Sequence, residues 1–232
     1  MAFEKIYLDA RQKENRIYSD EQVARLPYVE RSHIHFKEWS VRKRSAFRLA
    51  KYLNSKKKPL SIFEVGCGNG WLCGLLADLK NSVVIGNDIN NLELNQAKRV
   101  FCGKPGLKFE SGDWTNMDSL RKFDIIVFAA SIQYFPSFDN TIINAFSFLK
   151  PGGEIHILDS PFYDPGELEK ARQRSHIYYE SLGKCEMKAY YFHHVLDSLN
   201  GFKYKILFNP DNFISKIIFT KDPFPWICIT PG

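Results

Sequence analysis

Beyond residue 60 the chain alternates between short apolar runs and stretches with helical spacing of apolar positions. Short apolar runs predict strands, and apolar residues three or four positions apart predict helices. Strands are predicted at residues 60–65, 82–86, 107–109, 123–128 and 154–158, with helices at 71–79, 92–101 and 142–149 between them. Strands and helices that alternate at this length predict right-handed crossovers and a mostly parallel sheet.

The two ends of the chain have a different pattern. Residues 1–58 are predicted to form a helical cap, and residues 59–232 the α/β core. Within the core, residues 160–200 are predicted to be a mainly helical insertion that contributes to a lid. After Gly201, two of three apolar segments (202–208, 216–219 and 226–229) are expected to complete the sheet.

Charge is unevenly distributed along the sequence. The net charge is +6, but residues 1–60 hold 15 Lys or Arg against 7 Asp or Glu, whereas the remainder holds 17 against 19. Arg44, Arg48 and Lys51 share one face of the helix predicted over residues 40–53. This basic excess indicates either a surface for an anionic substrate, a nucleic acid or an acidic lipid, or a solvated helix face.

Several classes of protein are disfavoured. No apolar run approaches the roughly 18 residues that a membrane span needs, and residues 1–10 lack the apolar stretch of a secretory signal. The five cysteines are scattered and form no Cys-x-x-Cys, which argues against a disulfide framework or a zinc cluster. We therefore expect a protein of the reducing cytoplasm.

The sharpest local feature is a glycine cluster between the first predicted strand and the first helix of the core. Gly66, Gly68 and Gly70 permit a tight turn and close approach of a ligand to the backbone. In open α/β sheets the ligand crevice lies at this end of the strands. Trp71 stands where a dinucleotide-binding fingerprint needs a small residue, which argues against that class of site. A phosphate-binding loop is excluded as well, because no Gly-Lys-Ser or Gly-Lys-Thr follows.

The cluster and four later motifs resemble the class I S-adenosylmethionine-dependent methyltransferases, in particular the small-molecule enzymes. The motifs are Glu64-Val-Gly-Cys-Gly-Asn-Gly70, Asp88 eighteen residues after Gly70, Asp113 before Trp114, residues 123–131, and residues 149–154. In the last motif, residues 150–153 are expected to form the turn that leads into the fifth strand. The resemblance covers residues 60–160 well and 200–232 loosely. It implies a Rossmann-like three-layer sandwich with a mostly parallel seven-stranded sheet, the last strand antiparallel, behind an N-terminal helical cap.

The resemblance also implies the cofactor, S-adenosylmethionine, with S-adenosylhomocysteine as product. Asp88 would hold the ribose hydroxyls, and Asp113 and Trp114 would lie at the adenine. Two simpler alternatives remain: Asp88 could cap the following helix, and Asp113 could cap a turn. The residues expected to contact the cofactor are Glu64, Gly66, Cys67, Gly68, Gly70, Asp88, Ile89, Asp113, Trp114, Ala129 and Ala130.

The acceptor side is less clearly marked. Gln133, Tyr134 and Tyr163 are expected to contact the acceptor, because they follow the fourth and fifth strands. No catalytic base can be assigned; the candidates are His193, His194 and Tyr163, whereas His156 is expected in the core.

Motifs of base-amine, cytosine-carbon and metal-dependent catechol methyltransferases are missing, which favours metal-free transfer to a small molecule. The alternatives are a methyltransferase that acts on RNA or another polyanion through the basic face, a NAD-dependent oxidoreductase, and a non-catalytic cofactor-binding protein. The sequence does not indicate an oligomeric state.

Overall fold

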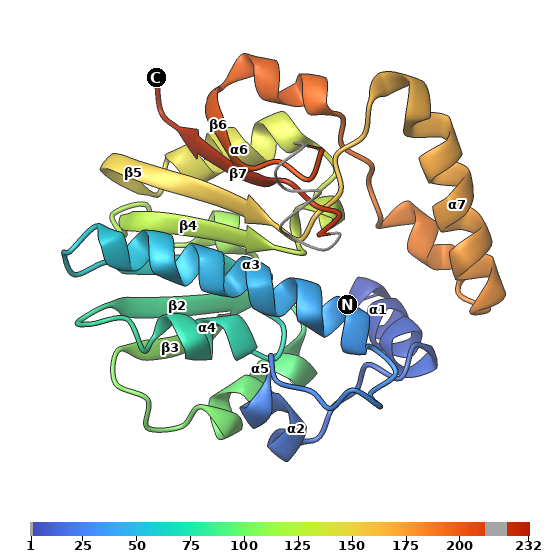
Figure 1. Ribbon diagram of the computed structural model, residues 1–232, viewed down its shortest axis with the longest axis horizontal. Helices are drawn as coiled ribbons and strands as arrows, with labels where there is room; N and C mark the ends of the chain where they lie inside the picture. Colours follow the sequence, from blue (N-terminus) through green and yellow to red (C-terminus); the bar gives the residue numbers. More distant parts are fainter. Residues whose placement is uncertain (1, 212–221) are drawn as a thin grey trace.

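A seven-stranded sheet runs through the centre of the molecule (Figure 1). The computed structural model describes residues 2–211 and 222–232. The strands, in the spatial order β3-β2-β1-β4-β5-β7-β6, are β1 (Ser61–Val65), β2 (Val83–Asp88), β3 (Leu107–Ser111), β4 (Phe123–Ala129), β5 (Leu149–Leu158), β6 (Lys203–Phe208) and β7 (Trp226–Thr230). β7 pairs antiparallel with both β5 and β6, and the other pairings are parallel. The predicted fold class is confirmed.

Helices cover both faces of this sheet. They are α1 (Ala2–Lys13), α2 (Asp20–Arg25), α3 (Phe36–Ser55), α4 (Trp71–Leu76), α5 (Asn91–Val100), α6 (Phe138–Phe146) and α7 (Leu168–Ser181). Short 3-10 helices are η1 (Trp114–Asn116), η2 (Ile132–Tyr134), η3 (Pro165–Glu167), η4 (Cys185–Ala189) and η5 (Leu196–Gly201).

The alternation of side chains along β4 shows how the core is divided. Ile125 and Val127 pack with the apolar residues of α3 and α4 on one face. Their neighbours Ile126 and Phe128 pack with those of α6 on the other. All four are fully buried. A strand that is apolar on both faces is what a sheet covered on both sides requires.

Helix α3 lies across one face of the sheet and is attached to the chain just before β7 (Figure 1). The attachment is Asp222, whose buried carboxylate accepts hydrogen bonds from Arg44 Nε and Arg48 Nη1, both at 2.7 Å. Two of the three residues that define the predicted basic face are therefore paired with an internal carboxylate. The same attachment fixes the position of α3, which carries Trp39 and Arg42 towards the carboxyl ends of the strands.

Three segments differ from, or go beyond, what the pattern predicts. The turn expected at residues 150–153 lies inside β5, where the pairing register with β4 shifts between Phe123 and Ile125. In the 160–200 insertion, α7 and the 3-10 helices are interrupted by non-helical backbone at residues 191–194. Segments 202–208 and 226–229 form the final strand pair, and 216–219 lies outside the described residues.

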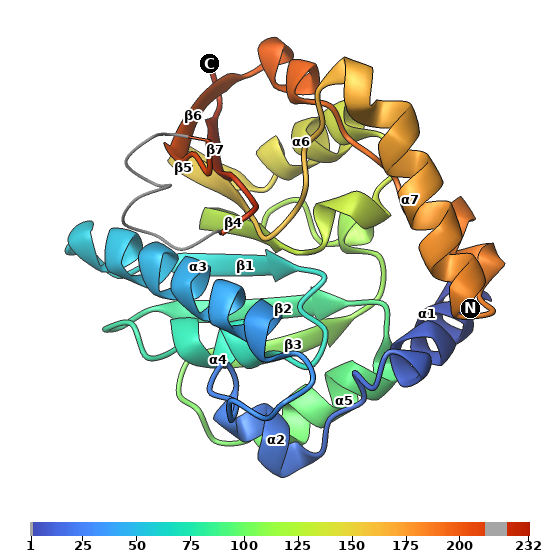
Figure 2. The same cartoon turned by 45° about the vertical axis from the view of Figure 1, so that its right-hand side comes forward.

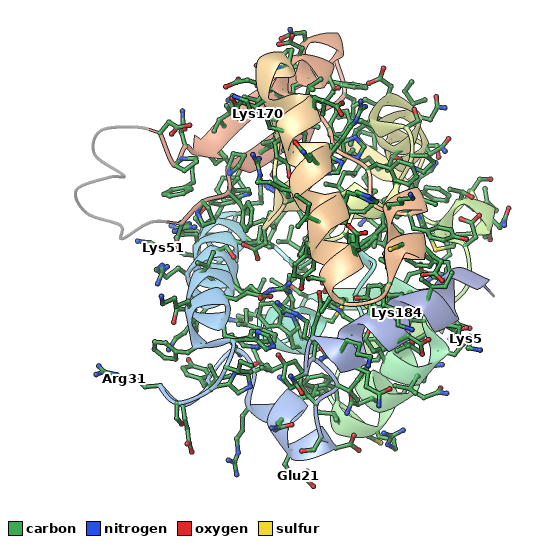
Figure 3. The ribbon with its side chains drawn as sticks, turned by 90° about the vertical axis from the view of Figure 1, so that its right-hand side faces the viewer. Lys5, Glu21, Arg31, Lys51, Lys170 and Lys184 are labelled. Atoms are coloured by element: carbon green, nitrogen blue, oxygen red, sulfur yellow. The ribbon has the colours of Figure 1, made fainter. Side chains whose placement is uncertain are left out.

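The insertion and the N-terminal helix meet beside the sheet (Figure 2). Lys184 Nζ lies 2.8 Å from Asp9 Oδ2, and Tyr178 donates a hydrogen bond to Glu14 at 2.5 Å. In the side view of Figure 3, Lys184 lies beside α1, and Lys170 marks the opposite end of α7. Among the described residues, none of the helices has the length and apolar character needed to cross a membrane.

Candidate functional site

A cavity of about 570 Å³ opens at the carboxyl ends of β1 and β4, where the strand order reverses. We call it the inner cavity. Its floor is formed by the glycine loop, by residues 87–90 after β2 and by residues 129–131 after β4, and its cover by α1 and α3. Pockets that bind cofactor-sized molecules have volumes of roughly 300–1,000 Å³. The position agrees with the ligand crevice of open α/β sheets.

The glycine loop is held tightly against the neighbouring strand ends. The N–H groups of Gly66 and Cys67 both donate to the Asn87 carbonyl, at 2.8 and 3.0 Å. Gly66 has φ +74°, and a Cβ there would lie 2.7 Å from the Ser131 Cβ, so only glycine fits without displacement. Gly68, with φ +52°, also turns bare backbone towards the inner cavity.

Asp88 joins the glycine loop to the start of α5. Its Oδ2 accepts the Gly68 N–H at 2.7 Å, and its Oδ1 accepts the Asn90 N–H at 2.8 Å. Burial raises the pKa of this carboxyl, and the backbone N–H donors partly offset the rise. Asn90, not Asp88, is the N-cap of α5. A carboxylate has about four lone-pair sites, so Asp88 can still accept a further donor from the cavity.

Two more buried carboxyl groups face the same cavity, and with Asp88 they form what we call the acidic wall. Burial raises the pKa of Glu64 to about 8 and that of Glu93 to about 7, and in both cases the nearby Asp88 raises the pKa further. Cys73 donates to Glu64 at 2.8 Å, and Asn90 donates to Glu93 at 2.9 Å. Clustered carboxyls with raised pKa values are typical of functional sites.

Arginines line the side of the inner cavity that is formed by the N-terminal segments. We call Arg11, Arg16 and Arg42 the arginine wall. Arg16 pairs with both oxygens of Glu38, and Arg42 Nε donates to the same carboxylate at 2.9 Å. Although burial alone would raise the pKa of Glu38, Arg42 and Arg16 lower it to about 2.

The arginine wall also borders a second cavity of about 340 Å³, which we call the outer cavity. The two cavities share Arg11, Arg16, Glu38, Arg42 and Tyr134. The outer cavity is completed by residues of α7 and the segment after it, including Arg174 and Tyr191. The molecule thus offers a two-part space, with the glycine loop at its inner end and the insertion at its outer end.

Asp113 and Trp114 lie at another side of the inner cavity. Asp113 is exposed and caps η1, because its Oδ1 accepts from the N–H and the hydroxyl of Thr115 at 3.0 and 2.8 Å. Trp114 is buried against Phe128 and Phe135. Its indole Nε1 is buried and has no hydrogen-bond partner among the described residues, so it remains a donor for another acceptor.

Most of the residues predicted for the cofactor are brought together. Those that line the inner cavity are Glu64, Gly66, Cys67, Gly68, Asp88, Ile89, Asp113, Trp114, Ala129 and Ala130. Gly70 does not line it; a Cβ at Gly70 would lie 2.6 Å from the Phe109 ring behind the loop. Ala130 has φ +54°, an unusual conformation for a residue with a side chain, at the point where β4 meets the cavity.

Of the residues predicted for the acceptor, only Tyr134 lines either cavity. Gln133 is buried, donates to the Ala130 carbonyl at 2.7 Å and accepts from Ser160 at 3.0 Å. Tyr163 instead forms an isolated bridge with Val195.

The two histidine candidates also lie outside both cavities. His194 is buried with Nε2 3.0 Å from the Ile132 carbonyl, and His193 Nε2 lies 2.8 Å from the Ser175 hydroxyl. Burial lowers the pKa of both rings. Neither histidine lines either cavity, although His193 contacts Ser175 and Tyr191 of the outer cavity.

The residues that the sequence reasoning missed come from the N-terminal segments. Phe3, Tyr7 and Arg11 of α1 line the inner cavity, as does Arg42 of α3. The signal in the sequence for the two arginines is the excess of basic residues before residue 60. That signal indicated an anionic partner but not which arginines would face it.

One group of metal-ligating residue types lies apart from both cavities. Potential ligand atoms of Glu154, His156 and Cys228 lie within 4.8 Å of one another at the β5–β7 pair. His156 is fully buried, as predicted, and its Nδ1 accepts from Trp226 Nε1 at 3.1 Å. Lys56 Nζ already lies 2.8 Å from Glu154, so the carboxylate has a cation beside it without a metal.

Comparison with known protein families identifies the core. Residues 56–206 match the family model described as a methyltransferase domain. The malonyl-[acyl-carrier protein] O-methyltransferase of Halalkalibacterium halodurans is 26% identical over 147 residues, which is 59% of this chain and 54% of that protein. The chain thus spans about half the length of the curated relatives it matches.

Solved structures agree with the fold over nearly the whole chain. The plantazolicin methyltransferase BpumL, in complex with S-adenosylhomocysteine, superposes with a TM-score of 0.59 at 16% identity, covering 100% of this chain and 97% of that one. The magnesium protoporphyrin IX methyltransferase of Synechocystis PCC 6803, with the same bound product, gives a TM-score of 0.58 at 13% identity, covering 90% and 92%.

Proposed function

Because the chain belongs to the class I S-adenosylmethionine-dependent methyltransferase family, we propose that it transfers a methyl group to a small molecule held in the inner and outer cavities. The observation that carries this proposal is the meeting of the glycine loop with Asp88 at one wall of the inner cavity. There the Gly68 N–H lies 2.7 Å from the Asp88 carboxylate. The loop and the carboxylate are the two motifs that the family uses for its cofactor.

The residues of the inner cavity fit that cofactor. The bare backbone at Gly66 and Gly68 leaves room that a side chain would fill. The Asp88 carboxylate suits the ribose hydroxyls, which it would accept in charge-assisted hydrogen bonds. We assign Ile89, Asp113 and Trp114 to the adenine and Ala129 and Ala130 to the methyl-donor end.

The acidic wall fits the charge of the cofactor. When bound, S-adenosylmethionine supplies an activated methyl group on a sulfonium cation, and it also carries an ammonium group. Burial makes Glu64, Asp88 and Glu93 costly to ionise, and the nearby Arg11 and Arg42 offset only part of that cost. A cation in the cavity would favour their ionised forms, so binding and ionisation support each other.

The remaining task of the chain is to position the acceptor and to exclude water. The leaving group is a neutral thioether, so it needs no acid. Holding the reacting groups in line contributes roughly 7–11 kcal/mol in comparable reactions. α1, α3 and the insertion would act as the lid that positions the acceptor and excludes water.

Burial raises the pKa of Tyr7 and Tyr134, so they serve as hydrogen-bond donors and not as bases. The proposed transfer is free of metal.

A small acceptor is favoured over RNA. Arg44 and Arg48 of the predicted basic face are paired with Asp222, and Lys56 with Glu154. Part of the basic excess of the N-terminal segments is therefore used inside the molecule. The names of the relatives point the same way, since magnesium protoporphyrin IX, for example, is a small molecule.

Thermal unfolding with S-adenosylhomocysteine beside NAD tests this proposal. At about 100-fold above the dissociation constant, a ligand adds about 2.7 kcal/mol to the unfolding free energy. We expect S-adenosylhomocysteine to raise the midpoint by roughly 2–4 °C or more, and NAD to leave it unchanged. A shift with NAD alone would overturn the assignment. Transfer of label from the donor to a metabolite then separates an enzyme from a protein that only binds the cofactor.

A further inference from the structure

The outer cavity has a surplus of positive charge. Arg11, Arg16, Arg42 and Arg174 line it against two carboxylates, Glu14 and Glu38. Arginine keeps its charge at any pH that the protein tolerates. Both carboxylates are already engaged: Glu38 pairs with Arg16 and Arg42, and Glu14 lies 3.1 Å from Arg16. Within the lining of the outer cavity, positive charges therefore outnumber negative ones by two, and Arg174 is the arginine of this set that does not also line the inner cavity.

The arginines also keep donors free for a ligand. Arg42 uses Nε for Glu38, and within the described residues no protein acceptor is bonded to its two Nη atoms. Arg174 projects from α7 and has no ion pair or hydrogen bond in the described part of the chain, although it lines the outer cavity. Guanidinium groups with free Nη donors match the two oxygens of a carboxylate or phosphate.

Aromatic side chains complete the same space. Tyr134, Tyr179 and Tyr191 line the outer cavity, and Tyr191 contacts both of the others edge to face. Burial raises the pKa of all three, so they stay neutral. They offer flat apolar surface with hydroxyl donors at the rim, which suits an organic body attached to an anionic group.

We propose that the methyl acceptor is a small organic acid, whose carboxylate or phosphate group binds Arg42 and Arg174 in the outer cavity while its body lies on the tyrosines. This inference rests on the proposed function. It gives the two ends of the space opposite charges, with the cationic cofactor on the acidic wall and the anionic acceptor on the arginines. Arg174 is then a specificity residue supplied by the insertion, and Arg42 is one supplied by α3.

A matched pair of fluorescent dyes tests the inference without knowledge of the natural acceptor. The probes are 8-anilinonaphthalene-1-sulfonate and its uncharged analogue N-phenyl-1-naphthylamine, each titrated into protein saturated with S-adenosylhomocysteine. We expect the sulfonate to bind more tightly, and the substitution Arg174→Gln to weaken it about three- to tenfold. The uncharged dye should bind both proteins equally.

Arg172→Gln is the matched control. Arg172 lies on the same helix and is exposed, pairs with Glu169 at 3.7 Å and lines neither cavity. This substitution should leave the affinity for both dyes unchanged. Equal binding of the two dyes to the wild type, or an equal effect of Arg174→Gln on both, would overturn the inference.

Calorimetry with S-adenosylhomocysteine separates the two proposals. Absence of this binding in the wild type would refute the proposed function. Unchanged binding in Arg174→Gln would mean that any change in dye affinity arises at the acceptor end of the space and not at the cofactor end.

A second measurement uses the charge of the natural acceptor. Metabolites are passed over an anion exchanger at neutral pH before labelling with the methyl donor. The acceptor should be in the retained fraction, and pretreatment with alkaline phosphatase distinguishes phosphate from carboxylate. An acceptor in the unretained fraction would contradict the inference.

Discussion

The acidic wall and the arginine wall face the same cavity, but their charges are set in different ways. Glu64, Asp88 and Glu93 belong to β1, β2 and α5, and their ionisation depends on pH and on what the cavity contains. The arginines come from the N-terminal segments and are permanently charged. The comparison teaches that the α/β core provides the adjustable half of the site, whereas the cap and the insertion provide the fixed half.

The glycine loop beside the acidic wall can be distorted without altering any charge. Gly66→Ala would place a Cβ 2.7 Å from that of Ser131, at a φ of +74°. We expect the backbone strain and the overpacking together to cost about 2–5 kcal/mol. The loss should be divided between the unfolding free energy, measured by denaturant titration, and the affinity for S-adenosylhomocysteine, measured by calorimetry.

Gly103→Ala is the control for this substitution. Gly103 also has a positive φ, +83°, but a Cβ there would meet nothing within 4 Å. It should lower only the unfolding free energy, by about 1–2 kcal/mol. If Gly66→Ala and Gly103→Ala behaved alike, the close fit of the loop would not matter for binding.

A single charge can be removed from the acidic wall. Asp88→Ala should lose about 1.5–3 kcal/mol of cofactor affinity, the range for hydrogen bonds to a charged group. Asp113→Ala should lose less, about 0.5–1.5 kcal/mol, because Asp113 is exposed and already caps η1. Calorimetry that found Asp88→Ala unchanged would mean that the ribose is held elsewhere.

The sensitivity to pH sharpens the contrast between the walls. Because burial raises the pKa of Glu93 to about 7 and that of Glu64 to about 8, both are largely neutral at low pH. As the pH rises they ionise and attract the sulfonium, so the affinity for S-adenosylmethionine should increase between about pH 6 and 9. This affinity can rise by at most about tenfold per pH unit for each proton that is released on binding.

S-adenosylhomocysteine provides the control for the pH series. It carries the same amino acid group but no charge on sulfur, so its affinity should depend less on pH. Glu64→Gln should remove the part of the pH dependence of S-adenosylmethionine affinity that lies near pH 8. Identical pH profiles for the two ligands would show that the acidic wall does not sense the sulfonium.

The fold could be predicted to a large extent because its determinants are local. Apolar runs and helical periodicities located the strands, and the glycine spacing located the floor of the inner cavity. The turn at residues 150–153 was placed outside its strand, because the pattern cannot show that β5 extends past a register shift in its pairing with β4. Local patterns describe segments, whereas such a shift depends on the neighbouring strand.

The acceptor end of the site could not be predicted in the same way. Gln133 and Tyr134 are adjacent in the chain and both follow β4, yet only Tyr134 reaches the cavity, because Gln133 bonds with Ser160 inside the molecule. The cover of the inner cavity depends on long-range contacts, such as the ion pair of Asp9 with Lys184, that the sequence pattern does not predict. These contacts decide which residues of α1 face the cofactor end.

Three of the four tryptophans of the chain, Trp39, Trp71 and Trp114, line the inner cavity, whereas Trp226 lies at β7. The intrinsic ultraviolet emission of the protein therefore originates largely from the walls of the site. Trp39 belongs to the cap, whereas Trp71 and Trp114 belong to the core. Occupancy of the cavity and movement of its cover can consequently be followed in real time, with no label attached to either partner.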